Sequence, residues 1–445
     1  MSAALSPVAE QDKQTYLADL AVLSRTSGAA PGWLRELRAN AEARFAEVRF
    51  PTTHDEDWKY TSVAPILRVP FRSLSGSREV PLSHEIESLV PFPLSGRRLI
   101  FVGGHYSREL SSEPEADVGS GATMAPLAHA LGSAVVKDHL GRNVGAESNA
   151  FAVLNTALLR DGAVVHVPGG QVVDDPIHIV FLATSEDGLS AYHPRILIVV
   201  DEGAQATILE SYVSVPGARY FTNSVTELVV GDRAVVRHCR VQAESEAAFH
   251  IATMRVRLGR ASSFSSFSLS TGAALARSDL NVVLAGEGAE CTLDGLYLAG
   301  GTQHVDNHTA IDHASPHGTS RQLYKGVLDG RARAVFNGKV IVRPGSQKTD
   351  AQQTNRNLLL SDEATVDTKP QLEIFADDVK CTHGAAIGQL DEEAIFYLKS
   401  RGVGEEQART MLTQGFAIEV IGRVASVAAR APLEQLVLTK LRKGS

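Results

Sequence analysis

The chain has 445 residues, of which 44% are hydrophobic and 21% charged, a composition typical of a soluble globular protein with about two or three domains. Its formal net charge of −8 argues against general binding to nucleic acid or to a membrane surface, because no basic excess is present to hold phosphates. No uninterrupted apolar segment approaches the roughly 18 residues that a membrane span needs, and the start of the sequence lacks a secretory signal pattern. The three cysteines form no CxxC pair, which excludes zinc-ribbon and ferredoxin-type spacings and is typical of a reducing compartment. We therefore expect a cytoplasmic protein.

Residues 1–160 are expected to form an N-terminal helical and linking region. The sequence between residues 73 and 121 is rich in Ser, Pro, Gly and acidic residues, which indicates irregular structure with a few strands, including Arg98–Val102. Apolar residues at three- and four-residue steps predict helices over Gln11–Leu23, Gly32–Val48 and Ser148–Leu159.

Residues 161–390 are expected to form a β core, because short β-prone runs alternate with Gly, Asp and Asn. No strong helical stripe interrupts these runs, which argues against alternating βαβ units. The clearest predicted strands cover residues 163–167, 177–181, 196–200, 206–209 and 234–238.

A repeat runs through this β core. A glycine followed closely by alanine and a strand recurs at steps of 28, 28 and 27 residues, at Gly203, Gly231, Gly259 and Gly286. A steady period of this length indicates a solenoid whose coils need their neighbours to complete a hydrophobic core. Because each repeat contains strands instead of helices, the pattern favours a parallel β-helix. A large β-sandwich is the alternative fold.

Residues 391–445 are expected to form a small C-terminal helical domain. Asp391 is the predicted N-cap of a first helix, since acidic residues follow it in the first turn, and Gly402 ends that helix. A second helix is predicted over Glu405–Ile421 and a third over Pro432–Leu441.

Four histidines and two aspartates are concentrated in one segment, as His304, Asp306, His308, Asp312, His313 and His317. Imidazole and carboxylate groups bind zinc and iron(II), so a lone metalloprotein built on this cluster is one hypothesis. However, HxxxH spacing brings two imidazoles together on a helix, whereas residues 309–311 are β-prone. The alternative is a strand and turn whose histidines satisfy turns or face solvent.

A second candidate site is Cys381-Thr382-His383. In an extended strand, residues i and i+2 point to the same face, so Cys381 and His383 would project together. A thiol and an imidazole side by side suit iron or a sulfur species, but two ligands do not complete a tetrahedral site. A partner chain or small molecule would have to supply the rest. The alternative is a buried structural cysteine beside a hydrogen-bonded histidine.

Motifs of common enzyme classes give no positive support for catalysis. The sequence contains neither a GxSxG nucleophile elbow nor a GxxxxGK[ST] phosphate loop. Because some β-helix proteins are enzymes, a stand-alone carbohydrate- or acyl-modifying enzyme remains the alternative function, which turnover by the isolated chain would support.

Several ordered motifs resemble the SufB/SufD family of iron–sulfur cluster assembly proteins. The resemblance covers most of the chain, from about residue 54 to about residue 420. Its motifs are Asp57–Thr61, Asp161–Gly162, His166–Pro168, Pro194–Val200, Phe336–Val340, Gln347–Asn355, Leu358–Leu360, Pro370–Ile374, Ala376–Ala385 and Ile395–Gly402.

Within this family the chain resembles the SufD-like form. SufB-type chains look like Gly-Asp-x-Cys-Gly-Ala-His-Thr just after the Leu-Leu stretch, and that cysteine is the implied sulfur acceptor. Here Ala364 stands at the matching position, and an alanine can neither carry sulfur nor ligate iron. The run from Lys380 to Ala385 has the SufD-like form instead.

The resemblance implies a mainly β protein, a right-handed parallel β-helix flanked by N-terminal and C-terminal α-helical regions. It implies a non-catalytic scaffold subunit that pairs with a SufB-like paralogue and docks SufC ATPase subunits on its C-terminal helices. His383, with Cys381 beside it, would lie near the interface with SufB, where His383 would hold iron transiently while a cluster forms. No cofactor would be bound stably. A homodimer of the isolated chain is also expected to be feasible, because an edge shaped for a similar partner can pair with its own copy.

Overall fold

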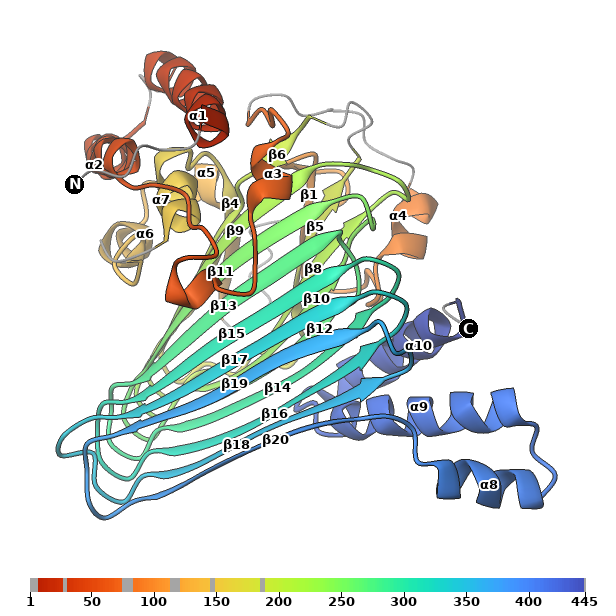
Figure 1. Cartoon of the computed structure of the whole chain (residues 1–445). Helices are drawn as coiled ribbons and strands as arrows, with labels where there is room; N and C mark the ends of the chain where they lie inside the picture. The colour runs from red at the N-terminus through yellow and green to blue at the C-terminus, as the bar shows by residue number, and fades with distance from the viewer. Residues whose placement is uncertain are drawn as a thin grey trace.

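The computed structural model describes residues 7–26, 30–73, 83–112, 121–144, 149–184 and 189–443. The protein is mainly β and is built around a parallel β-solenoid of about 8 turns, flanked by N-terminal and C-terminal helices (Figure 1). Two sheets face each other across a narrow lumen. The predicted solenoid is therefore confirmed, and the β-sandwich is wrong, because neighbouring strands in each sheet are almost all parallel and one coil apart.

The first sheet has ten strands. In spatial order they are β2 (His105–Tyr106), β1 (Arg98–Val102), β5 (Ile177–Ala183), β8 (Gln205–Ser214), β10 (Val235–Ala243), β12 (Ser263–Ser270), β14 (Glu290–Ala299), β16 (Thr319–Leu328), β18 (Asp350–Leu359) and β20 (Lys380–Gly388). The second sheet, which faces it, contains β19 (Thr365–Ile374), β17 (Arg333–Val342), β15 (His304–His313), β13 (Leu275–Leu284), β11 (Phe249–Leu258), β9 (Phe221–Val230), β7 (Arg195–Val200), β4 (Gly162–Val167) and β3 (Thr123–Pro126), with β6 (Ala191–Tyr192) paired to β9.

The register explains the repeat in the sequence. Val235 of β10 pairs with Gln205 of the preceding coil and with Ser263 of the following one. The repeated glycines lie in the turns that carry the chain from the second sheet to the first. A Cβ at Gly286 would stand 2.1 Å from the backbone nitrogen of Arg260 in the preceding coil, so only glycine lets these two turns stack.

The same corner has a constant backbone conformation. The residue two positions before each first-sheet strand from β8 to β18 has a positive φ. These residues are Gly203, Arg233, Ala261, Gly288, His317 and Lys348. Asparagine and glycine favour this left-handed region, and other residues adopt it at some cost, so the solenoid imposes its corner geometry on whichever side chain occurs there.

Strand alternation divides the side chains between the lumen and the outer faces. The lumen core contains aliphatic and aromatic side chains from both sheets, such as Ile208 and Phe264 from the first and Val256 from the second. Outward-facing positions of the first sheet, including Cys239 and Phe267, are covered by the C-terminal helices. The hydrophobic core is therefore continuous along the solenoid and extends outward under its helical covers.

The N-terminal helices pack mainly against the outer face of the second sheet. Buried Asn155 of the last of them donates from Nδ2 to the backbone oxygens of Pro194 and Asn223, and buried Arg195 binds Glu227 at 2.6 Å. The helical elements before the β core are α1 (Pro7–Thr26), α2 (Gly32–Glu47), the 3-10 turn η1 (Glu56–Trp58), α3 (Ala64–Leu67), α4 (Ser83–Leu89), α5 (Leu127–Ala130), α6 (Ala134–His139) and α7 (Ala150–Ala157).

Three of these helices fall within or close to the predicted ranges, whereas α4 lies in a region predicted to be irregular. Part of that region, residues 74–82 and 113–120, lies outside the described residues, as does Ser148 at the predicted start of α7. Strands β1 and β3, which precede residue 161, extend the two solenoid sheets.

Three helices follow the solenoid: α8 (Glu392–Ser400), α9 (Glu405–Ile421) and α10 (Val427–Lys443). Asp391 caps α8 as predicted, because its Oδ1 accepts a hydrogen bond from the backbone nitrogen of Glu393 at 2.9 Å. Helix α10 begins five residues earlier than expected, so Pro432 lies inside it instead of opening it. Helices α9 and α10 pack on the first sheet, whereas α8 projects beyond β20 (Figure 1).

Candidate functional site at the open end of the solenoid

The solenoid ends in two exposed edge strands, β19 and β20, which together form what we call the open end. In the part of the chain that the structure describes, each strand pairs on one side only, with β17 and β18 respectively. Most side chains of β20 are exposed and those of β19 are half-buried. Such unpaired strands present rows of backbone donors and acceptors that can pair with another chain.

Pro370 confirms which side of β19 is free. Thr365 and Phe375 donate their backbone N–H groups inward, to the carbonyls of Ala332 and Val342. Because these donors alternate along a strand, the N–H position of residue 370 faces the free edge. A proline there removes no hydrogen bond to β17, which is why it is tolerated in the middle of this strand.

Cys381 and His383 lie in β20 and point to the same face, the end of the lumen. In the ladder with β18, Cys381 pairs with Ala351 and His383 with Gln353. Cys381 is half-buried against a small apolar cluster, and this burial raises the pKa of its thiol. His383 is exposed, and the glycine and alanines that follow it in β20 leave space around its ring.

These two side chains do not complete a metal site by themselves. Among the described residues, no group of three or more His, Cys, Asp or Glu side chains is placed to hold a metal ion. The open end therefore offers one exposed imidazole and one protonated thiol next to unpaired backbone groups.

Comparison with known proteins places this chain in a family. Residues 181–416 match the SUF system FeS cluster assembly, SufBD core domain, and residues 11–179 match the SufBD protein N-terminal region. The chain belongs to the SufBD family. An iron–sulfur cluster assembly SufBD family protein of Synechocystis sp. is 34% identical to it, over 92% of each chain. The iron–sulfur cluster assembly protein SufD of Escherichia coli is 33% identical, over 83% of this chain and 84% of that protein. The chain is thus a SufD-like member of the SufBD family.

Ala364, which the sequence resemblance matches to the cysteine of SufB-type chains, is buried in the turn before β19. Its methyl group packs with the lumen core. In this SufBD-family chain the position contributes to hydrophobic packing, and the cysteine and the histidine of the open end come from β20 instead.

The histidine-rich segment forms strand β15, as its β-prone residues predicted. Alternation places His304 and His308 on the outer face with Asp306, whereas His313 is buried on the lumen face and His317 is an exposed corner residue. The four imidazoles are therefore not brought together, and the metal-cluster hypothesis has no geometric support among the described residues. Burial lowers the pKa of His313 to about 4, so its ring is neutral at neutral pH.

The outer-face part of this segment holds the N-terminal region onto the solenoid instead. Arg277 of β13 donates from Nη1 to Asp306 Oδ2 at 2.6 Å, and its guanidinium lies 3.7 Å from the ring centre of Trp58. Thr61 donates to the same carboxylate oxygen at 2.6 Å and lies 2.8 Å from Nε2 of His304. We call Trp58, Thr61, Arg277, His304 and Asp306 the N-terminal clamp. The position that a metal cation would take is occupied by a guanidinium.

Electrostatics favours the charged form of the clamp. Burial alone would raise the pKa of Asp306, but the neighbouring Arg277 and His308 lower it well below its usual range. Arg277 also binds Asp279 at 2.9 Å, and the two carboxylates raise its pKa despite burial. The Asp57–Thr61 motif thus has a structural role, because it supplies Trp58 and Thr61 to this contact.

A buried polar network inside the lumen was missed by the sequence analysis. His238 lies 3.2 Å from Glu210, Arg240 donates to Nε2 of His250 at 2.6 Å, and Nδ1 of His250 lies 2.7 Å from Glu244. Because a guanidinium can only donate, His250 must accept at Nε2 and carry its proton on Nδ1. The sequence contained a signal for this network. Inward and outward side chains alternate along β8 and β10, and this alternation places the charged residues Glu210 and Arg240 on the lumen face.

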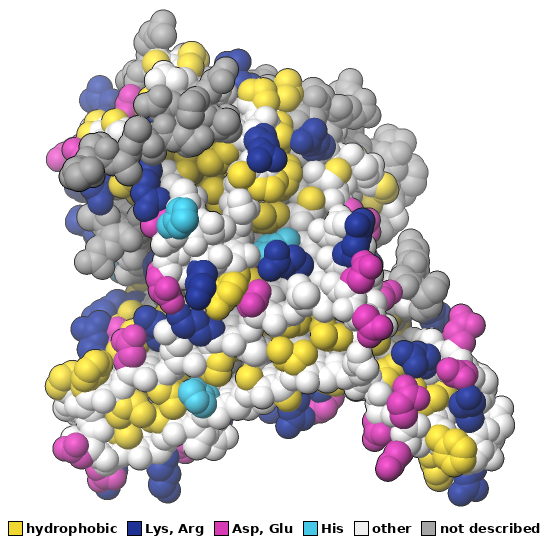
Figure 2. All heavy atoms as spheres, viewed as in Figure 1, with side chains coloured by type: hydrophobic (Ala, Val, Ile, Leu, Met, Phe, Trp, Pro, Cys, Tyr) yellow, Lys and Arg dark blue, Asp and Glu magenta, His cyan; other side chains and the backbone are white. Residues whose placement is uncertain are grey.

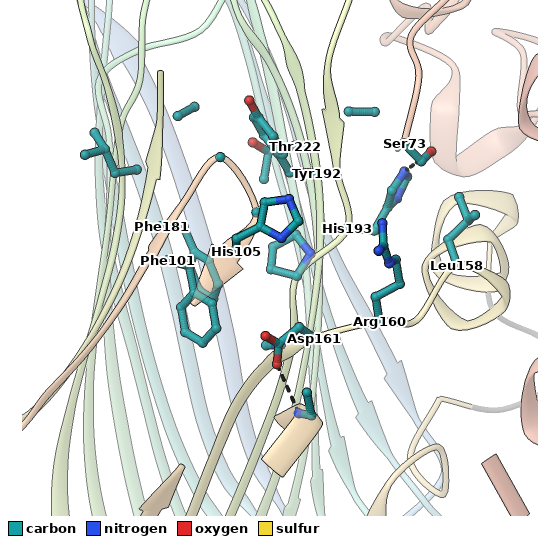
Figure 3. A pocket seen from close by; sticks show the side chains of 18 of the residues that line it. Ser73, Phe101, His105, Leu158, Arg160, Asp161, Phe181, Tyr192, His193 and Thr222 are labelled. Atoms are coloured by element: carbon teal, nitrogen blue, oxygen red, sulfur yellow. Dashed lines mark hydrogen bonds between the residues drawn. The ribbon is translucent and has the colours of Figure 1, made fainter. Parts of the chain in front are cut away.

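A cavity of about 260 Å³ lies at the other end of the lumen, beside β1 and β4 to β6 (Figure 3). The stacked rings of Phe101 and Phe181, 5.0 Å apart, form one wall. Asp161 also lines the cavity, and its Oδ1 accepts hydrogen bonds from the backbone nitrogens of Ala128 and Gly162 at 3.0 and 2.8 Å. Burial raises the pKa of Asp161. This cavity is separated from Cys381 and His383 by most of the solenoid's length.

No helix in the described part of the chain is both long and apolar enough to cross a membrane.

Proposed function

We propose that this chain is a non-catalytic scaffold subunit of a SUF iron–sulfur cluster assembly complex and that it acts through its open end. Membership in the SufBD family and the 33% identity to the E. coli protein named SufD support a role in iron–sulfur cluster assembly. The observation that carries the site is the pair of unpaired edge strands that bring His383 and Cys381 to the end of the lumen.

A second β-solenoid, that of a SufB-like paralogue, is the partner that fits this surface. Its own edge strands could continue both sheets, with backbone hydrogen bonds giving affinity and side chains giving specificity. Exposed Ile374, Phe375 and Ile387 lie at or just beyond the ends of β19 and β20 and would supply apolar contact area. A second copy of this chain is the competing occupant of the same edge.

The two side chains would have different roles at such a junction. The exposed imidazole of His383 can offer a lone pair to iron(II), which is the cargo of the complex. Burial raises the pKa of Cys381, so its thiol stays protonated at neutral pH and is the weaker ligand. The partner would then supply the sulfur-carrying thiolate. A cluster held by so few permanent ligands can be released to a recipient protein.

The projecting helix α8 is the proposed docking site for a SufC ATPase. Phe396 and Tyr397 on α8 are 73% and 57% exposed, and Met411 on α9 is also exposed. Figure 2 shows a hydrophobic patch on these helices with acidic and basic side chains around it. Exposed aromatic pairs with a charged rim are typical of protein interfaces. ATP-driven motion of the docked subunit could then change the geometry of the open end.

The test of the scaffold role is co-purification with SufB-like and SufC-like proteins, followed by anaerobic iron–sulfur reconstitution. We expect a stable complex in which His383→Ala removes the cluster absorbance, while Cys381→Ala reduces it much less. His317→Ala is the matched control, because His317 is an exposed histidine at a solenoid corner. A complex that assembles clusters normally with His383→Ala would refute the proposed ligand. Turnover of a substrate by the isolated chain would refute the scaffold role.

The ATPase contact has its own test. Phe396→Ala combined with Tyr397→Ala should abolish co-purification of the SufC-like protein while leaving the SufB-like partner bound. Val427→Ala on α10 is the control, since Val427 is as exposed as Phe396 but lies on another helix. Retention of SufC by the double variant would show that α8 is not the docking site.

A further inference from the structure

A chain of buried side-chain amides runs through the last coils of the lumen. Gln353 of β18 donates from Nε2 to Oε1 of Gln322 at 2.8 Å, and Gln322 donates from Nε2 to Thr309 at 2.8 Å. Gln353 is only 2% exposed and Gln322 is also buried. These bonds fix the direction of both amides, because the Gln353 nitrogen is turned away from the open end toward β16 and the Gln322 nitrogen is turned across the lumen toward β15.

The opposite sheet is shaped to admit this amide. A Cβ at Gly338 of β17 would lie 2.3 Å from Nε2 of Gln353 and 2.8 Å from its Cδ. Any larger residue at position 338 would displace the Gln353 side chain from its place across the lumen. The Phe336–Val340 motif that marked the family therefore contains the glycine that makes room for Gln353.

The amide chain leaves one atom without a partner. Among the described residues, Oε1 of Gln353 is buried and accepts no hydrogen bond. Buried carbonyl oxygens in native proteins are nearly always paired, so an isolated one at the end of a fixed chain calls for a donor. The residue that pairs with Gln353 on the next strand outward is His383. Paired residues on neighbouring strands project to the same face about 4.8 Å apart, so an imidazole N–H of His383 can reach this oxygen by rotation of the histidine side chain.

We propose that Gln353 is the positioning residue of His383. Its Oε1 accepts a hydrogen bond from one ring nitrogen of His383 and holds the proton there. The other ring nitrogen then keeps its lone pair and is turned to the open end. Histidines that bind metals usually donate their second N–H to a carbonyl or carboxylate in this way, which fixes both the tautomer and the ring orientation. The inference rests on the proposed role of His383 as a ligand for iron.

The chemical consequence is a ligand whose orientation is set before iron arrives. Gln353 would not touch iron, and its effect would be transmitted through the imidazole. Loss of such a supporting contact typically weakens metal binding about 10- to 100-fold. The Gln353–Gln322–Thr309 chain would therefore connect the packed lumen to the reactive end of the solenoid.

The tautomer of His383 can be measured in the isolated, metal-free chain. Labelling with ¹⁵N-histidine and long-range ¹H–¹⁵N correlation spectra at one fixed pH would distinguish the two neutral forms, with His383→Gln used to assign the signal. We expect one dominant tautomer in the wild type and a mixture in Gln353→Leu. Gln353→Glu keeps an acceptor oxygen for His383, although it loses the amide donor to Gln322, and should restore a single tautomer. Gln352→Leu is the matched control, because Gln352 is the exposed neighbour on the opposite face of the same strand. Thermal unfolding of each variant checks that it folds.

A second measurement separates this inference from the proposed function. Iron(II) titration of the complex with the SufB-like partner should show a 10- to 100-fold weaker affinity for Gln353→Leu, with Gln353→Glu close to wild type. An unchanged His383 tautomer in Gln353→Leu would overturn the positioning role, whatever the complex does. A changed tautomer together with normal cluster assembly by His383→Ala would uphold the contact and refute the role of His383 in assembly.

Discussion

The two ends of the solenoid are finished in different ways. At the N-terminal end the outermost strands, β2 and β3, are short and antiparallel to their neighbours, and helices α5 to α7 follow or flank them. At the open end the outermost strands, β19 and β20, have ten and nine residues and are parallel to their neighbours. Short or covered edges prevent pairing with other chains, whereas long bare edges invite it. The difference indicates that one end is closed for stability and the other is kept open for a partner.

The ion pairs on the outer face of the second sheet also differ between the two regions, since they are buried near the clamp and more exposed at β19. The N-terminal clamp buries a charged network under Trp58, and an ion pair between Glu56 and Lys369, largely exposed at its glutamate, reaches from the same segment to β19. Buried pairs lose several kcal/mol when one partner is removed, whereas exposed pairs contribute little. We therefore expect substitutions near the clamp to lower the stability of the fold. Substitutions at the open end should instead affect partner binding and cluster assembly.

The largest expected effect is on the clamp. Asp306→Ala removes the acceptor shared by Arg277 and Thr61 and leaves a buried guanidinium with fewer partners, so the free energy of unfolding should fall by about 3 kcal/mol. Urea unfolding followed by tryptophan fluorescence measures this, because Trp58 lies in the clamp. Asp312→Ala is the control on the same strand, since the Asp312–Arg343 pair is largely exposed at its arginine. Its effect should stay below about 1 kcal/mol. Equal losses for the two variants would contradict a special role for the clamp.

The next effect is on partner binding at the open end. Backbone N–H groups of even-numbered residues in β20 point to β18, as Lys380 shows by donating to Thr349, so the N–H of Ala385 faces the free edge. Ala385→Pro removes that donor and should weaken binding of the SufB-like partner on the order of 100-fold while leaving the thermal midpoint nearly unchanged. Ala385→Val, which keeps the N–H, should bind normally. Calorimetric titration gives both affinities, and normal binding by the proline variant would show that the partner does not extend this strand.

Acid should loosen the N-terminal coils. Burial lowers the pKa of His178 and of His193 to about 3, whereas the unfolded chain titrates near 6.5. Below pH 6.5 the unfolded state therefore binds protons that the native state does not, and the free energy of unfolding falls with pH until about pH 3. Between pH 6 and pH 5 these two groups should account for a loss of about 2 kcal/mol. The double variant His178→Gln, His193→Gln should lose that much less in urea unfolding over this interval. An unchanged slope would contradict the neutral state of the two rings.

The smallest effect is expected at the exposed link between the two regions. Lys369→Met removes the ion pair with Glu56 on the outer face of β19. Because both groups are exposed to solvent, the thermal midpoint should not change measurably. A clear decrease would show that this contact stabilises the edge strand. The stability of the open end would then depend on the N-terminal region.

Local sequence patterns predicted the strands and turns that recur in each coil of the solenoid. The glycine period predicted the coils because turns stacked coil on coil require the same small residue at the same place, as Gly286 against Arg260 shows. Strand alternation correctly placed Cys381 and His383 on one face of β20. The start of α10 could not be predicted in the same way, since packing of the helix on the first sheet outweighs the tendency of Pro432 to open a helix.

Contacts between distant segments could not be predicted from the sequence. Nothing near Trp58 indicates Arg277, and nothing near His304 indicates Thr61, because these pairs are separated by more than two hundred residues and meet only when the N-terminal segment crosses the second sheet. The histidine segment resembled a metal site for this reason: its pattern was visible, but the guanidinium that occupies its centre was not. The isolated oxygen of Gln353 is likewise visible only once the strands are in register.

The sequence by itself determined the solenoid and the SufD-like character of β20, because these depend on periodicity and on short motifs. Only the tertiary structure decided that one end is closed and the other open, that Cys381 is half-buried while His383 is exposed, and that Gln353 lies beneath His383. The physical reason is that alternation specifies the face on which a side chain lies, whereas burial and hydrogen-bond partners depend on which strands become neighbours and where the stacking of coils stops.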